Sequence, residues 1–275
     1  MITEFDICLD AQDDWRALHR QIPSLFGREI GDALRGHVER NGLLDPLSGP
    51  VAGSEVRIDG DNYRETVVAH GINARQRAVL LSLQDALDYH DGGFAIYASE
   101  AVSPLAMRLM EHVPGFVGSE YLPTEEDRQA HPEVIHQNVL ALSFADASHD
   151  AYISCDVLEH VPDLDATLRE AARILKPGGA FIGTVPFAAG RYDTIIKARL
   201  ERGRIEYDGE PEFHGNPTRP GEGSLVFQIP GWDLLDRMRD AGFASAQIRL
   251  SLSQRYGVFG TQTAFLSSFV ATKRR

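Results

Sequence analysis

The stretch SFADASHDAYISCDVLEHVPDLDATLREAARILKPGGAFIGTVPF, residues 143–187, decides the fold class of this chain. Its apolar runs predict strands at 151–155 and 180–185, with a helix over 164–176 between them. The helix carries one apolar face, formed by Leu164, Leu168, Ala171, Ala172 and Leu175. Gly178 stands where a helix C-cap favours a left-handed residue. The segment is therefore predicted to be a strand–helix–strand unit of an α/β protein.

Strands and helices alternate from Phe94 onward, which predicts a largely parallel sheet covered by helices. The other elements predicted are strands 94–98, 116–119 and 134–139, helices 104–112 and 232–243, and a closing antiparallel pair, 245–253 and 263–273. Residues 187–230 are rich in Gly and Pro and too long for a plain connection. We expect them to form an insertion over the carboxyl ends of the strands, where α/β sheets bind ligands.

Residues 1–92 are expected to form a separate N-terminal region. Helical spacing of apolar residues predicts helices over the first fifty residues, and the stretch DPLSGPVAGS, 45–54, suggests a boundary. The runs EVRI and YRETVVA flank the turn residues DGDN and predict a hairpin. A helix is predicted over 73–90, ending at Gly92 and Gly93.

Composition excludes several classes of function. The 275-residue chain has a net charge of −13, which repels nucleic acid and anionic lipid. The acidic start MITEFDICLDAQDD lacks the features of a signal peptide, and no apolar run reaches the roughly 20 residues that span a bilayer. Cys8 and Cys155 are too few for a disulfide framework. We therefore expect a cytoplasmic protein that binds neither nucleic acid nor membranes.

The motif order in residues 143–187 resembles the second half of the class I S-adenosylmethionine (SAM)-dependent methyltransferases of type 11. In that family a strand F-D-x-x-x-S leads to L-E-H-V, a helix, L-K-P-G-G and another strand; LEHV stands here at 158–161 and LKPGG at 175–179. The resemblance covers residues 94–275. It implies a Rossmann-like α/β fold for residues 93–275, with a seven-stranded, mostly parallel sheet and an antiparallel last strand, and SAM as the cofactor.

The first loop of that family commonly reads D-x-G-x-G-x-G, and the matching stretch here is FAIYASEAVSPLA, 94–106. The glycine positions fall on Ser99, Ala101 and Ser103, and the acid falls on Tyr97. Small residues retain much of the close approach to a ligand but lose the free choice of φ. Pro104 suits the first turn of the next helix. The cofactor contacts implied at this loop are Ala98, Ser99, Glu100, Ala101 and Ser103; a ligand-free turn is the competing interpretation.

The resemblance implies further cofactor contacts at the ends of the next strands. Glu120 would accept hydrogen bonds from the ribose hydroxyls, and Tyr121 would lie against the adenine. Asn138 would read the adenine amino group and Val139 the ring, while Cys155 would lie at the floor of the site. The competing interpretations are a surface glutamate, a core aromatic residue, a turn asparagine and a buried cysteine that acts as a small hydrophobe.

The stretch YRETVVAHGINARQRAV, 63–79, resembles a segment that closes a small zinc ribbon in some relatives, with the pattern RE…C-x-x-C-G-x-N-x-R-x-R. Arg64, Arg75 and Arg77 match it, but no cysteine does. Without thiolates we expect no zinc here, and His70 is expected to be a turn residue rather than a ligand. No HExxH or similar histidine cluster is present either, so no metal site is predicted.

Methyl transfer requires a base only when the acceptor must lose a proton, and histidine suits that role near neutral pH. The fold implied would point His160 toward the catalytic side of the sheet, and His214 in the insertion is the second candidate, with Asp156 able to orient either one. The competing interpretations are a helix-start histidine bonded to backbone and a histidine that holds a loop.

These patterns lead to one main functional hypothesis and two others. The main one is a SAM-dependent methyltransferase that acts on an O or N atom of a small-molecule acceptor, with a homodimer left open as its assembly. A catalytically inactive protein of the same fold, serving as a binding or scaffold subunit, is the alternative, because the loop glycines are lost. A nucleotide-dependent oxidoreductase is disfavoured, since no G-x-G-x-x-G follows any strand.

Overall fold

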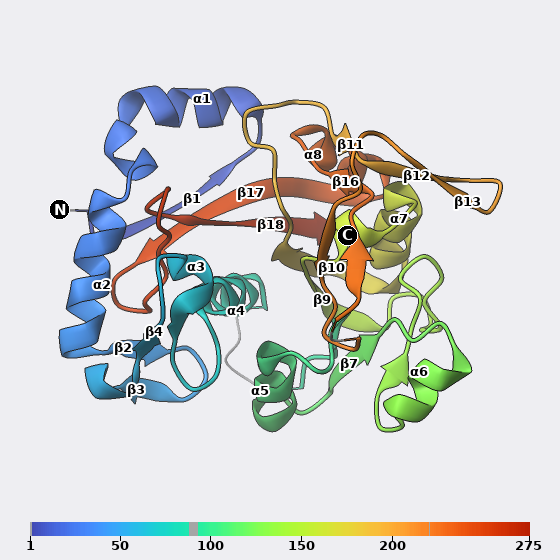
Figure 1. The fold of residues 1–275 in the computed structure, drawn as a ribbon, viewed down its shortest axis with the longest axis horizontal. Helices are drawn as coiled ribbons and strands as arrows, with labels where there is room; N and C mark the ends of the chain where they lie inside the picture. Colours follow the sequence, from blue (N-terminus) through green and yellow to red (C-terminus); the bar gives the residue numbers. More distant parts are fainter. Residues whose placement is uncertain (1, 88–92, 220) are drawn as a thin grey trace. The chain divides into compact units, whose positions relative to one another are not determined.

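The computed structural model describes residues 2–87, 93–219 and 221–275 (Figure 1). The chain divides into two compact units, Met1–Tyr89 with Gln247–Ser268, and His90–Ala246 with Phe269–Arg275. The first unit therefore includes a C-terminal segment that we expected in the second domain. The reason is strand pairing, because Ile248–Ser253 pair with a strand at the N-terminus.

The first unit contains short strands and helices. Its elements are β1 Glu4–Leu9, α1 Gln12–Gln21, η1 Pro23–Phe26, α2 Glu29–Asn41, β2 Leu43–Asp45, β3 Gly49–Val51, η2 Gly53–Glu55, β4 Arg57–Ile58, α3 Tyr63–Thr66, β5 Val67–Val68 and α4 Ala74–Leu87. The end of the helix predicted over 73–90, with Gly92, lies outside the described residues.

Three predictions for this unit were wrong. Residues 4–9 form a strand, because the alternating burial of EFDICL suits an edge strand paired antiparallel with β17. The supposed boundary at 45–54 contains the second strand of the β2–β3 hairpin. The strands β4 and β5 do pair, but YRET between them is the helix α3 rather than strand, so the connection is longer than the turn DGDN.

Arg77 organises the centre of this unit. Its guanidinium is fully buried and donates hydrogen bonds to four backbone carbonyls, those of Val67, Ile72, Tyr256 and Gly257, at 2.7–2.9 Å. Burial lowers the pKa of Arg77 to about 9, which leaves it charged at neutral pH. His70 has a φ of 48° in the adjoining turn, which confirms it as a turn residue.

The second unit alternates strands and helices as predicted. Its elements are β6 Ile96–Ala98, α5 Pro104–His112, β7 Phe116–Glu120, α6 Glu125–Ala130, β8 Ile135–His136, β9 His149–Cys155, η3 Leu158–His160, α7 Leu164–Ile174, β10 Leu175–Thr184, β11 Ile195–Ile196, β12 Ala198–Glu201, β13 Arg204–Tyr207, β14 Phe213–Gly215, β15 Gly223–Leu225, β16 Gln228–Ile229 and α8 Asp233–Asp240. The strands β17, Phe243–Ser253, and β18, Leu266–Lys273, have residues in both units.

The main sheet of the described residues has the strand order β1-β17-β18-β10-β9-β6-β7-β8. Strands β6, β7, β8, β9 and β10 pair in parallel, whereas β18 pairs antiparallel with β10. This confirms the Rossmann-like α/β fold with a mostly parallel sheet and antiparallel terminal strand. The apolar face of α7 is buried, and α7 contacts α8, where Arg237 Nε donates to Asp165 Oδ1 at 2.6 Å.

Two details of the central unit differ from expectation. The helix α7 ends at Ile174, and Leu175 already has extended backbone, because the strand β10 begins there. Gly178 does have a left-handed φ of 81°, but it lies four residues past the helix end, in the irregular start of β10, and is not its C-cap. The strand predicted over 134–139 is shortened to β8, because a side-chain-stabilised turn follows it.

The insertion consists of small two-stranded sheets. The pairs are β11 with β16, β12 with β13, and β14 with β15, all antiparallel. None of the helices described is both long and apolar enough to cross a bilayer.

Candidate active site

The residues expected to bind the cofactor lie at the carboxyl ends of neighbouring parallel strands. Ala98 ends β6, Glu120 ends β7 and Cys155 ends β9. The register places Ala98 opposite Gly118 of β7 and Ile153 of β9. Open α/β sheets bind ligands at this edge. The fold therefore brings the predicted residues of β6, β7 and β9 to one edge of the sheet.

The loop between β6 and α5 is held by Glu120. Its Oε1 accepts hydrogen bonds from the backbone N–H groups of Ala101, at 2.8 Å, and Val102, at 3.1 Å. A carboxylate that accepts two backbone N–H groups forms charge-assisted bonds, which are stronger than neutral ones. Both of these bonds go to Oε1, and neither involves Oε2. Sequence reasoning predicted the position of Glu120 but not this contact with the loop.

Close approach between the loop and the sheet depends on Gly118. A Cβ atom at this position would lie 2.6 Å from the carbonyl oxygen of Glu100, so only glycine lets the loop pack directly on β7. Tyr97, at the position of the missing acid, is fully buried, and its hydroxyl lies 2.8 Å from Ser119 Oγ. The close packing of the loop between β6 and α5 thus depends on a glycine of the neighbouring strand β7, Gly118.

Ser103 and Pro104 begin the helix α5. The hydroxyl of Ser103 accepts a hydrogen bond from the N–H of Ala106 at 3.1 Å, which is an N-cap. Pro104 occupies the first helical position, as predicted. The side chain of Ser103 therefore serves the helix, and its part in cofactor binding remains a proposal.

The two residues expected beside the adenine are placed differently from each other. Tyr121 is 60% exposed, and its ring centroid lies 5.8 Å from that of His136. Asn138 Oδ1 accepts a hydrogen bond from the N–H of Leu140 at 3.0 Å, so this oxygen stabilises a turn that also contains Val139. The competing interpretation of Asn138 as a turn residue thus has direct geometric support.

At the end of β9, Cys155 is buried and Asp156 has a left-handed φ of 52°. Asp156 Oδ1 accepts a hydrogen bond from Thr184 Oγ1 at 2.9 Å. This bond ties Asp156 to the end of β10. The pKa of His160 is lowered by burial, and the charge of Asp156 opposes this shift without reversing it.

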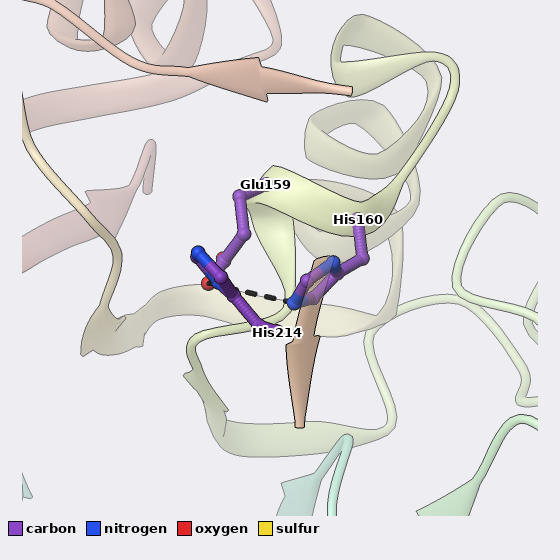
Figure 2. Close-up of side chains that lie close together, drawn as sticks. All are labelled: Glu159, His160 and His214. Atoms are coloured by element: carbon purple, nitrogen blue, oxygen red, sulfur yellow. Dashed lines mark ion pairs between the residues drawn. The ribbon is translucent and has the colours of Figure 1, made fainter. Parts of the chain in front are cut away.

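The insertion brings His214 to His160, as Figure 2 shows. Their ring centroids lie 5.4 Å apart and the rings are nearly perpendicular. The carboxylate of Glu159, which is fully buried, lies 3.7 Å from a nitrogen of each ring. Burial lowers the pKa of His160, which favours its neutral form near pH 7. Sequence reasoning missed Glu159, although the motif LEHV contains it.

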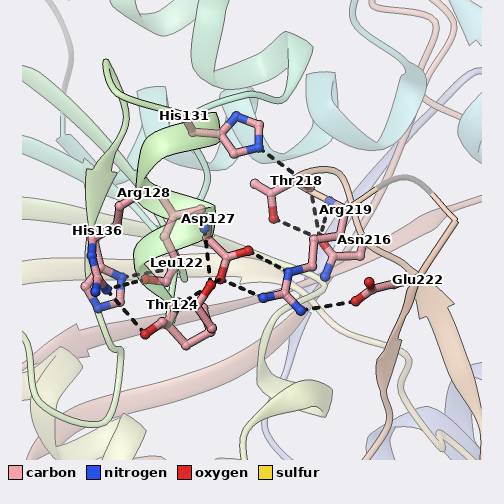
Figure 3. A network of polar contacts seen from close by, with 11 residues as sticks. Leu122, Thr124, Asp127, Arg128, His131, His136, Asn216, Thr218, Arg219 and Glu222 are labelled. Atoms are coloured by element: carbon pink, nitrogen blue, oxygen red, sulfur yellow. Dashed lines mark hydrogen bonds and ion pairs between the residues drawn. The ribbon is translucent and has the colours of Figure 1, made fainter.

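A second contact fastens the insertion to α6, as Figure 3 shows. Arg219 donates to both oxygens of Asp127, from Nε at 2.7 Å and from Nη2 at 2.6 Å. Thr124 Oγ1 also donates to Asp127 Oδ2 at 2.6 Å. His131 Nε2 donates to the carbonyl of Thr218 at 3.0 Å. These contacts connect Thr218 and Arg219 to the segment that follows β7.

Asp127→Asn is expected to loosen this connection, because the bidentate ion pair loses its charge. Hydrogen–deuterium exchange of residues 216–222 should become faster. Glu222→Gln, which alters the more exposed partner of the same arginine, should leave exchange nearly unchanged. The hydrogen bonds from Arg219 hold the pKa of Asp127 below its ordinary value of 3.8. The ion pair should therefore be fully formed above pH 3.8, and it should be lost only as the pH falls through the lowered pKa. Equal exchange rates in the two variants would contradict the conclusion that the ion pair between Asp127 and Arg219 fastens the insertion to α6.

Comparison with known proteins agrees with this architecture. Residues 104–183 match the family model described as methyltransferase domain. The chain is 35% identical over 119 residues to a ubiquinone/menaquinone biosynthesis C-methyltransferase from Rhodopseudomonas palustris, covering 41% of this chain and 45% of that protein. It is 36% identical over 104 residues to a sarcosine/dimethylglycine N-methyltransferase from Halorhodospira halochloris, covering 34% of this chain and 37% of that protein.

A solved structure from Burkholderia thailandensis, of 1,6-didemethyltoxoflavin-N1-methyltransferase with bound S-adenosylhomocysteine, aligns with 74% of this chain and 79% of its own. Its sequence identity is 14% and the TM-score is 0.43. The chain spans less than half the length of the two curated relatives named above. Residues 104–183 of this chain are thus similar to a methyltransferase domain, and they lie within the mostly parallel α/β sheet described above.

Proposed function

We propose that this protein transfers a methyl group from SAM to an O or N atom of a small-molecule acceptor. The observation that carries the proposal is Glu120 at the end of β7. Its carboxylate holds the glycine-free loop with one oxygen and keeps the other for a ribose diol. A loop fixed in this way needs no glycine flexibility to stay close to the cofactor.

The residues present fit the cofactor that the family implies. A carboxylate at the end of the second parallel strand matches a diol, which offers two donors. The remaining contacts proposed are Ala98, Ser99, Glu100, Ala101, Ser103, Tyr121, Asn138, Val139 and Cys155. When bound, SAM supplies an electrophilic methyl group. The protein has to align the acceptor with that methyl group and exclude water.

The acceptor is proposed to lie against the two histidines. His160 stands after the end of β9, and the insertion brings His214 to it. His160 Nδ1 donates to the carbonyl of Leu225 at 2.8 Å, so Nε2 is the nitrogen able to take a proton from the acceptor. The names of the two curated relatives specify carbon and nitrogen methylation, and the choice of an O or N acceptor here is our proposal.

The alternative function, an inactive scaffold of the same fold, has one specific observation in its favour. Glu120 and Asn138 already bond to backbone N–H groups of this chain. An oxygen engaged in this way offers less to a ligand.

A methyl-transfer assay separates the two functions. Protein would be incubated with methyl-labelled SAM and a panel of small hydroxyl- and amine-bearing compounds, and S-adenosylhomocysteine would be measured. The proposal expects acceptor-dependent product that His160→Ala reduces. Binding of SAM without product from any acceptor would support the scaffold function instead.

A further inference from the structure

Three groups that carry lone pairs converge at the end of β9, from the turn η3 and the insertion strand β14 (Figure 2). Glu159 Oε1 lies 3.7 Å from His160 Nε2 and 3.7 Å from His214 Nδ1. All three ligand atoms lie within 4.8 Å of one another. The carboxylate is fully buried, whereas the His214 side chain is 34% exposed.

The other nitrogen of each histidine is already used as a donor. His160 Nδ1 donates to the carbonyl of Leu225 at 2.8 Å. His214 Nε2 donates to Glu212 Oε1 at 3.2 Å, and the other oxygen of Glu212 forms an ion pair with Lys197 Nζ at 3.0 Å. In the neutral rings these bonds fix the tautomers. The nitrogens that face Glu159 therefore carry lone pairs.

Histidine metal ligands are oriented in this manner, with the second ring N–H donated to a carboxylate or backbone carbonyl. We propose that Glu159, His160 and His214 bind a divalent transition-metal cation of the zinc class. Zinc sites with two histidines and a glutamate have metal–ligand bonds of about 2.0–2.2 Å, so ligand atoms lie roughly 3.3 Å apart in a tetrahedral site. Modest side-chain movement from the observed spacing would bring the three atoms to that geometry.

Hydrogen bonds from the insertion hold the turn η3, which carries two of the ligands, in place. Gln228 Nε2 donates to the carbonyls of Leu158, at 2.7 Å, and Val161, at 2.9 Å. The N–H of Phe227 donates to the carbonyl of Glu159 at 2.7 Å. The insertion is thus fastened to the turn that carries two of the ligands. The exposed side of His214 leaves room for a fourth ligand from solvent or substrate.

The cation site rests on this geometry alone, while its role rests on the proposed function. A metal-bound acceptor oxygen loses its proton more readily, because the cation stabilises the anion. The two histidines would then act on the acceptor through the cation. The sequence predicted no metal site, because the ligands come from segments far apart and share no spacing motif.

The test is a calorimetric titration of chelator-treated protein with Zn²⁺, in the absence of SAM, followed by elemental analysis after gel filtration. The wild type is expected to retain about one zinc per chain. His214→Ala should lose stoichiometric binding. His112→Ala, which removes a half-buried histidine at the end of α5, should bind like the wild type. Glu212→Gln should weaken binding by about tenfold to a hundredfold, because it removes the carboxylate that orients His214 and leaves all three ligands in place.

Thermal melts of each variant provide the control for folding. If His214→Ala does not fold, two other measurements test the cation site. They are the zinc affinity of Glu212→Gln and the visible spectrum of the wild type loaded with Co²⁺. Absence of stoichiometric zinc in the wild type, or equal binding by His214→Ala and His112→Ala, would overturn the site. The zinc titration contains no SAM, so its outcome is independent of cofactor binding. A protein that binds S-adenosylhomocysteine in a separate titration but binds no zinc would overturn the cation site and leave the proposed function standing.

Discussion

Arg77→Met is expected to lower the free energy of unfolding by about 3–5 kcal/mol, a large share of the roughly 5–15 kcal/mol of a typical domain. The substitution leaves four backbone carbonyls without the guanidinium that now donates to them, and of these the carbonyl of Ile72 also accepts from the N–H of Ala69. Each unsatisfied acceptor costs about 1–3 kcal/mol before the structure relaxes. Methionine has a similar volume and can fill much of the same space, so lost packing contributes less than the lost hydrogen bonds.

Urea unfolding of the wild type and two variants measures this effect. Arg64→Met is the matched control, since Arg64 lies on the same short segment with its side chain 37% exposed and an ion pair to Glu65. That substitution should cost less than about 1 kcal/mol. Similar losses for the two variants would show that Arg77 does not organise the first unit.

Glu120→Gln is expected to weaken S-adenosylhomocysteine binding by about tenfold to a hundredfold, which corresponds to roughly 1.5–3 kcal/mol. Glutamine keeps a carbonyl oxygen that can accept from Ala101 and Val102, so the loop should stay in place. It replaces the second carboxylate oxygen with an amide donor, which cannot accept from a ribose hydroxyl.

Glu120→Ala is the comparison that separates the two roles of this residue. It removes the loop bonds as well, so it should also lower the melting temperature of the free protein, whereas Glu120→Gln should leave it nearly unchanged. Calorimetry and thermal melts on both variants provide the measurement. Unchanged binding in Glu120→Gln would remove Glu120 from the cofactor site.

The mostly parallel sheet and the helices α5, α7 and α8 of the second unit could be predicted from the sequence, because their apolar residues recur at regular spacing, whereas the short helix α6 was missed. The errors fell on short elements. Six residues at 4–9 alternate too briefly to reveal a strand, and only the pairing with β17 shows that they form one. The β2–β3 hairpin was taken for a boundary because its Pro and Gly residues form a tight turn rather than a linker.

The candidate site was predictable only in part. The sequence places Glu120 and His160 after their strands, and the fold puts both at the carboxyl edge of the sheet. It could not show that Glu120 bonds to Ala101 and Val102, because side-chain direction depends on the packed loop. The meeting of His214 with Glu159 depends on the path of the insertion, which no local pattern determines.

The most direct test of the central claim, that a glycine-free loop held by Glu120 still binds the cofactor, is a calorimetric titration of the wild type with S-adenosylhomocysteine. We predict saturable binding of about one ligand per chain, with a dissociation constant well below 1 mM, equivalent to more than about 4 kcal/mol. The double variant Ser99→Gly with Ala101→Gly, measured beside it, should bind at least as tightly. No binding by either protein at millimolar ligand would contradict the account and identify residues 99–103 as a structural turn.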